Sequence, residues 1–280
     1  MFLDFSPRVM GIWNLSPDSF SSDCEKGLAV TREHAQKLVA QGADVVDIGA
    51  ESTRPGAVSI SSEEEIARLE EPLMWARAHL AVPLSLDSYH VETVEWALEK
   101  NLIDIVNDVG ESTQVSEARE GRLYRAVARH HAAIILMAWG NPKEALPSYE
   151  VCIREIQQQL ERRYRLAREV GVHPKSIAVD PGIGFGKGFD NDLKLIHNAP
   201  RDLAFLSSPV VIAHSRKRCL GYATGLPKSE LDDPTAIACA IALKSGAAIL
   251  RVHRPDLACM ARSLVFPKNF LSRREDVPRL

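Results

Sequence analysis

Eight short runs of apolar, often β-branched residues recur along the chain, and they limit its possible folds more than any single motif does. Each run has the length of one strand and is nearly continuously apolar, as a parallel strand buried on both faces should be. Most of the runs end in polar, charged or glycine-rich residues. The runs are Val9–Trp13, Val45–Gly49, Pro83–Asp87, Asp104–Val109, Ala133–Met137, Ser176–Asp180, Pro209–Ser215 and Ala247–His253.

Stretches with helical periodicity and charged faces separate these runs. They are Thr31–Gln41, a segment that begins at Ser62, Val91–Lys100, Ser116–His131, Tyr149–Val170, Asn191–Asn198, Pro234–Ser245 and Asp256–Val265. A strand followed by a helix, repeated along the chain, predicts the α/β class and a (β/α)8 TIM barrel. The 280 residues fit a single barrel domain, and no linker or shift of composition divides them. An open, doubly wound parallel sheet is the structural alternative.

Composition excludes several classes of protein. The net charge is -3 and charged residues make up 25% of the chain, and because no face rich in Lys or Arg stands out, we expect no nucleic-acid binding. No apolar run has the length of a membrane span and the amino terminus lacks the pattern of a signal peptide, so we expect no membrane partner. The five cysteines are scattered without a C-x-x-C pair, which favours reduced thiols and a cytoplasmic location.

Asn14 follows the first run, at the end where a barrel carries its active site. Its side-chain oxygen could ligate a hard cation, or its amide could bind a phosphate oxygen. Ser16 then begins a polar loop, for which a plain turn is the simpler interpretation.

A hydroxyl pair, an arginine and a Pro-Gly turn follow the second run. Thr53, Arg54 and Pro55 therefore suit the capture of an anion at the barrel mouth. The competing interpretation is a salt bridge within the loop, between Arg54 and Glu51.

Acidic and amide residues stand at the ends of the third, fourth and sixth runs, namely Asp87, Asn107-Asp108 and Asp180. Each acid there either contacts a ligand or caps the helix that follows. The glycines that come after Asp180 let backbone approach a flat ligand, and Phe185 among them supplies an aromatic wall. A phosphate loop is the alternative, although the spacing fits neither common glycine-rich phosphate motif.

Basic residues end the last two runs. His214-Ser215 is followed by Arg216-Lys217-Arg218, and the eighth run closes with Arg251-Val252-His253. Because residues two apart on a strand share one side, Arg251 and His253 should point the same way. Barrels often bind phosphate at the ends of strands 7 and 8. Together with the acids, these cations predict a ligand with a phosphorylated end and a flat, donor-rich end.

These signatures, in this order, resemble those of the dihydropteroate synthase family. The resemblance extends from about Val9 to about Val265. The segments that carry it are Asn14–Ser21, Glu51–Gly56, Asp87-Ser88, Asn107-Asp108, Gly140–Pro142, Asp180–Lys187, Ser215–Lys217 and Arg251–His253.

The resemblance implies a role for each matching residue. The pterin pocket would consist of four polar residues and two apolar walls, which are Asp87, Asn107, Asp180 and Lys217, with Met137 and Phe185. The diphosphate would be held by Asn14, Arg251 and His253, with Thr53 and Arg54 on a mobile loop and Asn14 also on Mg²⁺. The 4-aminobenzoate site would include Ser16, Pro55 and Arg218.

The family also implies the reaction, in which 6-hydroxymethyl-7,8-dihydropterin diphosphate and 4-aminobenzoate are joined. The residues closest to the chemistry would be Asn14, Lys217, Arg251 and His253, which neutralise the leaving diphosphate together with the Mg²⁺ cofactor. The attacking amine needs no enzyme nucleophile, which agrees with the lack of an evident Ser-His-Asp arrangement. The two small molecules would be the partners, and family barrels tend to form homodimers.

Several positions depart from the usual family pattern and leave other functions open. Arg218 stands where Ser is usual, Arg254 where Asp is usual, and Ala138-Trp139 where His-Met is common. The first loop carries Ser22-Asp23-Cys24-Glu25 in place of the common Asp-Gly-Gly, and this loop, with Arg218 and Arg254, favours a divergent paralogue that uses another amine or has lost turnover. A pterin-binding methyltransferase or a scaffold would not need the diphosphate clamp of Arg251 and His253.

Overall fold

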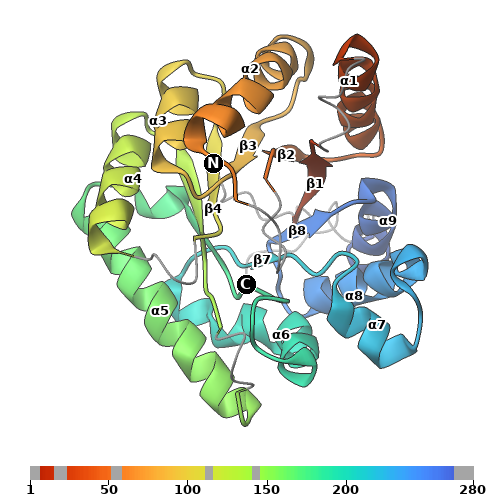
Figure 1. The fold of residues 1–280 in the computed structure, drawn as a ribbon. Helices are drawn as coiled ribbons and strands as arrows, with labels where there is room; N and C mark the ends of the chain where they lie inside the picture. The colour runs from red at the N-terminus through yellow and green to blue at the C-terminus, as the bar shows by residue number, and fades with distance from the viewer. Residues whose placement is uncertain (1–6, 16–23, 52–58, 111–115, 141–145, 268–280) are drawn as a thin grey trace, which may run out of the picture.

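The computed structural model describes residues 7–15, 24–51, 59–110, 116–140 and 146–267, with only the backbone of 24–28. Its strands lie at the centre of a ring of helices (Figure 1). The strands are β1 Arg8–Asn14, β2 Val45–Gly49, β3 Leu84–Asp87, β4 Ile105–Asp108, β5 Ala133–Met137, β6 Ile177–Asp180, β7 Val211–Ile212 and β8 Ile249–Val252. They follow the predicted runs closely.

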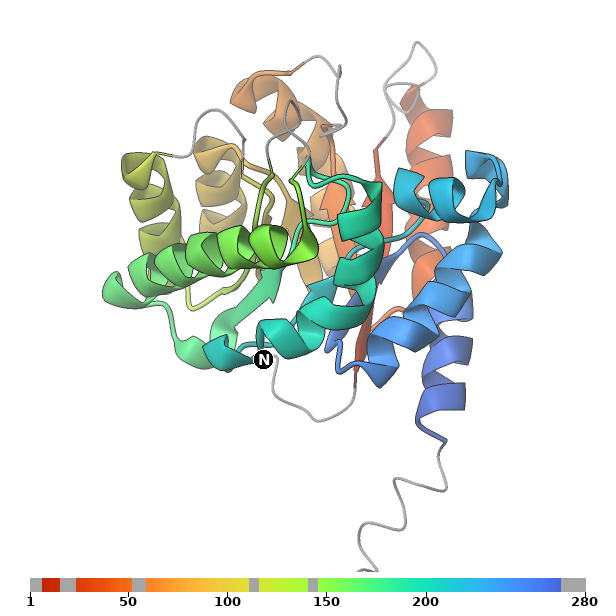
Figure 2. The same ribbon diagram turned by 90° about the horizontal axis from the view of Figure 1, so that it is seen from below.

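The helices alternate with these strands, and the long helix α5, in green, crosses in front of them in the view turned by 90° (Figure 2). The helices are α1 Cys24–Ala40, α2 Ser62–His79, α3 Val91–Glu99, α4 Glu117–Arg129, α5 Tyr149–Glu169, α6 Phe189–Asp202, α7 Arg218–Thr224, α8 Asp232–Lys244 and α9 Pro255–Val265. Local signals explain their starts: the Ser61 hydroxyl caps α2 by accepting from the backbone N–H of Glu64 at 3.2 Å.

All eight strands run parallel in one sheet, in the order β6-β5-β4-β3-β2-β1-β8-β7. A parallel bridge between Val179 and Val210 joins the two outer strands and closes the barrel. The TIM barrel prediction is therefore confirmed, and the open doubly wound sheet is wrong. The carboxyl ends of parallel strands meet at one mouth, so residues at the ends of all the strands become neighbours there.

Two elements differ from the sequence expectation. The seventh strand is only Val211–Ile212, because the chain leaves the ladder after Ile212 and turns at Arg216, which has a positive φ of 55°. Helix α1 begins at Cys24, seven residues before the predicted start at Thr31. In the part of the chain that the structure describes, no helix is long and apolar enough to cross a membrane.

The interior of the barrel is layered. Its lower layer is a cluster of buried apolar side chains that point inward, and they are Met10, Val45, Ile105, Ala133, Ile135, Ala178, Val211 and Ile249. Two residues further along four of these strands, on the same face, come Asp47, Asn107, Asp180 and Arg251. The interior thus changes from apolar to polar within one step of the strand period, and the polar layer forms the floor of the mouth.

Candidate active site

Arg251 on β8 connects the acids of two neighbouring strands across the mouth. Its Nε donates to Asp47 Oδ2 at 2.6 Å, and its Nη2 donates to Asp87 Oδ2. Burial opposes the charge of Arg251, but Asp47 and Asp87 outweigh it and hold the pKa of the guanidinium above its usual value. The sequence predicted that Arg251 and His253 point the same way. In the structure, the Arg251 guanidinium also contacts the acids of the mouth.

Asn107 on β4 completes this side of the mouth. Its amide Nδ2 donates to Asp47 Oδ2 at 3.1 Å, and its side chain is buried. Within the described part of the chain, the buried atoms Asp47 Oδ1 and Asp87 Oδ1 have no hydrogen-bond partner. Buried acceptors are rarely left unpaired, so these two oxygens mark a position for N–H groups of a ligand.

Burial changes the acidity of the carboxyl groups in this layer. It raises the pKa of Asp87 to about 7, against the attraction of Arg251 and with added repulsion from Asp47. It also raises the pKa of Asp180, whose Oδ1 accepts from the backbone N–H of Gly182 at 2.7 Å. Near neutral pH, a ligand with N–H donors would favour the ionised form of both groups.

Lys217 and Phe185 face each other at the opposite side of the mouth. The Lys217 ammonium lies 4.2 Å from the centroid of the Phe185 ring, a cation–π contact. Burial lowers the pKa of Lys217, and nearby Arg251 lowers it further. The structure thus brings together five of the six predicted pterin residues, and the sixth, Met137, ends β5 beside Asp180 of β6 in the ladder.

A buried ammonium holds the glycine-rich turn that carries Phe185. The Lys187 side chain is 1% exposed and donates to the carbonyls of Ala138, Gly182 and Phe185 at 2.8, 2.9 and 3.2 Å. Gly182 has a φ of +69°, and a Cβ there would lie 1.9 Å from the Ala138 carbonyl oxygen. The turn needs glycine at this point, and the lysine supplies donors to carbonyls that would otherwise be unpaired.

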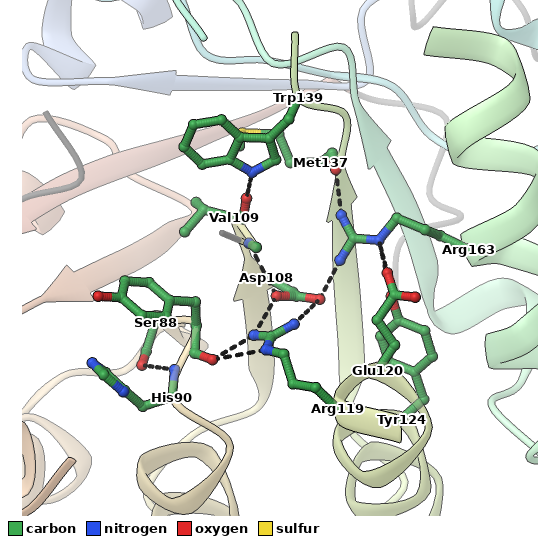
Figure 3. A network of polar contacts seen from close by, with 12 residues as sticks. Ser88, His90, Asp108, Val109, Arg119, Glu120, Tyr124, Met137, Trp139 and Arg163 are labelled. Atoms are coloured by element: carbon green, nitrogen blue, oxygen red, sulfur yellow. Dashed lines mark hydrogen bonds and ion pairs between the residues drawn. The ribbon is translucent and has the colours of Figure 1, made fainter. Parts of the chain in front are cut away.

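Asp108 was expected to contact a ligand or cap the helix that follows, but Ser116 caps α4 and the Asp108 carboxylate pairs with two arginines (Figure 3). It is fully buried, and its carboxylate pairs with Arg119 at 3.0 Å and with Arg163. The capping alternative is also wrong for Asp87, since the N-cap position of α3 is His90, which makes no side-chain cap. Asp108 points outward because it is adjacent to inward-facing Asn107 on the strand.

His253 lies at the ends of β7 and β8 with Ser215. The Ser215 hydroxyl oxygen accepts from the backbone N–H of His253 at 3.2 Å and lies 2.9 Å from Nδ1 of its ring. If the hydroxyl donates to Nδ1, the neutral ring carries its proton on Nε2, as a donor toward the mouth. Burial, with Arg216 and Arg251, lowers the pKa of His253 to about 3, so the ring is neutral at pH 7.

A basic groove of about 340 Å³ adjoins this histidine. It is lined by Ile12, Asn14, His34, Lys37, Gln41, Arg216, His253 and Arg254. Among these described lining residues there is no carboxylate, which suits an anion. Asn14 is exposed at the end of β1, so its oxygen is accessible in the groove.

Asn14 fits a magnesium ion that arrives with a phosphorylated ligand. In the described residues, no group of three or more His, Cys, Asp or Glu side chains could hold a metal ion. Mg²⁺ commonly takes one or two protein oxygens and completes its shell with phosphate oxygens and water. One amide oxygen in a groove without carboxylates matches that pattern.

The remaining predicted residues fall into two groups. Arg218 is exposed, with its guanidinium carbon 5.3 Å from the centroid of the Phe189 ring on α6, so it points away from the acids of the mouth. Ser16, Thr53, Arg54 and Pro55 lie outside the described residues, and their roles stay predictions. Glu51 has partners apart from Arg54: it accepts from the Tyr89 hydroxyl at 2.6 Å and pairs with His90 at 2.9 Å.

Sequence reasoning gave no role in the site to Asp47, Lys187 or Ser215, although Lys187 and Ser215 lie in segments that carry the family resemblance. Asp47 could have been found, because it lies two residues beyond inward-facing Val45 and is a charge inside an apolar run. Ser215 follows the seventh strand and has no distinguishing pattern. The sequence places Lys187 in the glycine-rich motif, but nothing local shows that its ammonium turns inward.

Comparison with known proteins agrees with this geometry. Residues 10–253 match the family model described as pterin binding enzyme. The dihydropteroate synthase of Synechocystis sp. is 37% identical over 91% of this chain and 86% of its own length. The structure of Xanthomonas albilineans dihydropteroate synthase with 4-aminobenzoic acid has a TM-score of 0.81 and is 33% identical, covering 98% of this chain and 94% of that one. The Anaplasma phagocytophilum enzyme with bound 6-hydroxymethylpterin-monophosphate has the same TM-score, at 29% identity, and covers 95% of this chain and 99% of that one.

Proposed function

The chain belongs to the pterin-binding enzyme family and is a transferase with dihydropteroate synthase function in folate synthesis, and we propose how the residues of its barrel mouth carry out that reaction. The substrates are the pterin diphosphate and 4-aminobenzoate. The single observation that supports this assignment of residues best is the pair of buried, unpaired carboxylate oxygens on Asp47 and Asp87. They face the mouth from adjacent strands, where the donor edge of a pterin would satisfy them.

The acidic side of the mouth binds the pterin ring. Asp180 and Asp87 accept from its amino and ring N–H groups, and Asn107 is oriented by its bond to Asp47. Lys217 donates to an acceptor atom of the ring, while Phe185 and Met137 pack on its faces. Leaving any of these donors unpaired would cost about 1–3 kcal/mol, which makes the pocket selective.

The basic side of the mouth binds the diphosphate and stabilises it as it leaves. The C–O bond between the exocyclic methylene and the diphosphate breaks, and the electron pair departs with the diphosphate. His253 donates from Nε2, and the cationic groove attracts the charge that grows on the leaving oxygen. The amine nitrogen of 4-aminobenzoate then forms the new C–N bond and releases its proton to solvent.

Magnesium would be held by Asn14 together with oxygens of the diphosphate. When bound, the ion supplies positive charge that neutralises the leaving group. Asn14 orients that end of the substrate, and His253 and the groove keep it aligned away from the pterin acids.

The second substrate, the location and the assembly are finer proposals. Ser16, Pro55 and Arg218 would line the 4-aminobenzoate site, with Thr53 and Arg54 contributing to the diphosphate end. A homodimer and a cytoplasmic location follow from the family resemblance and from the scattered cysteines. Sedimentation of the purified protein would test the dimer directly.

A single reaction series tests the proposed function. The purified protein receives pterin diphosphate with Mg²⁺, then 4-aminobenzoate, and diphosphate release is measured. We expect release to require the pterin diphosphate and the amine together, and to stop in Asp180→Asn but not in Asp190→Asn, which changes an exposed acid of α6. Pterin binding without any release would support the divergent paralogue instead.

A further inference from the structure

Trp139, just beyond β5, joins two parts of the mouth that are far apart in sequence. Its indole Nε1 donates to the backbone carbonyl of Val109, at the end of β4 (Figure 3). Its ring meets Phe185 edge-on, with centroids 4.7 Å apart and planes inclined by 65°. An edge-to-face pair at this distance is attractive by about 0.5–1.5 kcal/mol beyond the area it buries.

Helix α5 holds the backbone of this tryptophan from behind. Gln159 accepts from the backbone N–H of Trp139 at 3.1 Å and donates to its carbonyl at 2.8 Å. Arg163, four residues further along and therefore on the same face of the helix, donates to the carbonyl of Met137 and pairs with Asp108. The end of β5 is thus fixed at two points, and Trp139 has a defined starting direction.

The loop after β4 is shaped to receive the indole. Gly110 has a φ of +63°, and a Cβ at that position would lie 3.3 Å from Trp139 Nε1. Asp108 fixes the same loop by accepting from the Gly110 N–H at 3.1 Å. A side chain there would push the indole away from the Val109 carbonyl.

Phe185 depends on these contacts for its direction. It lies in the turn held by Lys187, and its ring receives the Lys217 ammonium at 4.2 Å. A shift of this ring would move both the apolar wall and the cation of the pterin pocket. Trp139 is the contact that ties the ring to the end of β4, beside Asn107.

We propose that Trp139 is a positioning residue for pterin recognition. It acts through Phe185, which it fixes relative to the end of β4, and so sets the width of the slot that receives the pterin. The inference rests on the proposed binding of pterin at this mouth.

The test compares Trp139→Leu and Trp139→Phe with the control Trp96→Leu. Trp139 is half-buried, and Trp96 is a partly buried tryptophan of α3 on the outside of the barrel. The measurements are KM for each substrate and the Kd of 6-hydroxymethylpterin by calorimetry. For Trp139→Leu we expect KM for the pterin diphosphate and Kd to rise about tenfold, with KM for 4-aminobenzoate within about twofold. Trp139→Phe keeps an aromatic ring but loses the N–H, so it should raise KM for the pterin diphosphate and Kd about threefold.

A general loss of structure would act differently from a positioning role. Equal rises of both KM values in Trp139→Phe, or parent-like pterin affinity in both variants, would overturn the proposal. If thermal melting shows that Trp139→Leu does not fold, the measurements on Trp139→Phe test the proposal. A parent protein that binds no pterin at all would overturn the proposed function instead.

Discussion

The two sides of the barrel mouth are built in different ways. On the acidic side, Asp47, Asn107 and Asp180 are at most 4% exposed and are fixed by hydrogen bonds between strands or to backbone. On the basic side, Arg216 and His253 are half-buried and are held by partners within the neighbouring loops and helix α8.

This difference separates recognition by geometry from recognition by charge. A buried acceptor that lacks a donor selects a ligand by the position of the ligand's N–H groups. A ligand that cannot donate there leaves the acceptor unsatisfied. A half-exposed cation attracts any anion, and its attraction is weakened by solvent and salt. Arg251 belongs to the last strand of the basic side but is bound to the acids, so it connects the two.

The largest effect should come from the acidic side. Asp180→Asn keeps an oxygen for the Gly182 N–H but presents an NH2 group to pterin donors, so pterin affinity should fall about hundredfold. Calorimetry with bare pterin measures this, and circular dichroism checks the fold. An affinity within about threefold of the parent's would mean that Asp180 does not face the pterin.

The acidity of Asp87 should appear in the pH dependence of binding. Its pKa of about 7 lies above the ordinary 3.8, so below pH 7 a proton must leave before pterin donors can bind the carboxylate. Pterin affinity should therefore rise with pH by up to about tenfold per unit and level off above about pH 7. The same raised pKa means that folded protein binds more protons than unfolded protein, so the stability due to Asp87 declines as pH rises from about 4 to about 7.

Asp87→Asn tests whether Asp87 causes both effects. The variant should lose both slopes, which titrations of affinity and of urea unfolding across pH 5 to 8 would show. Unchanged slopes in Asp87→Asn would assign the titration to another acid, Asp180 being the first to examine.

The basic side should respond to salt and to the loss of Ser215. Ser215→Ala removes the partner 2.9 Å from His253 Nδ1, so the orientation of the ring is no longer held by that contact. Affinity for the pterin diphosphate should fall about fivefold, and a rise of salt from about 0.05 to about 0.5 M should weaken it severalfold. Binding of bare pterin should change by less than about twofold in both experiments. If the binding of bare pterin weakened as much as that of the pterin diphosphate, the two sides of the mouth would not recognise ligands in different ways.

The smallest effect should come from Arg218. Its exposed guanidinium lies over Phe189, away from the buried acids, so Arg218→Ser should change turnover with 4-aminobenzoate by less than about threefold. Steady-state kinetics at saturating pterin diphosphate measure it. A large gain of activity in the variant would show instead that Arg218 blocks the second substrate.

The sequence predicted the fold and most of the acidic side because both follow from strand period and strand ends. Asp87 and Asp180 end their strands and Asn107 lies one residue before the end of β4, where parallel strands converge whatever the surrounding contacts are. Asp47 was overlooked because it lies inside its strand, two residues before the end. It shares the inward face of β2 with Val45, which is two residues earlier.

Other contacts could not be read from the chain because they depend on residues far away. Asp108 has the same local pattern as a ligand-binding acid, and only the packing of α4 and α5 brings Arg119 and Arg163 to it. The carbonyls that hold Lys187 come from two separate segments and form a site only after both have folded. Long-range pairings of this kind leave no local signal.

The layering of the interior has a consequence for how such a protein can evolve. Its apolar lower layer, from Met10 to Ile249, carries packing, whereas the polar residues one step above it carry specificity. Exchanges in the upper layer therefore alter which molecule is accepted while the packing below stays intact. Selection for a new substrate, or for escape from an inhibitor, can act on the mouth with little need for compensating changes in the lower barrel.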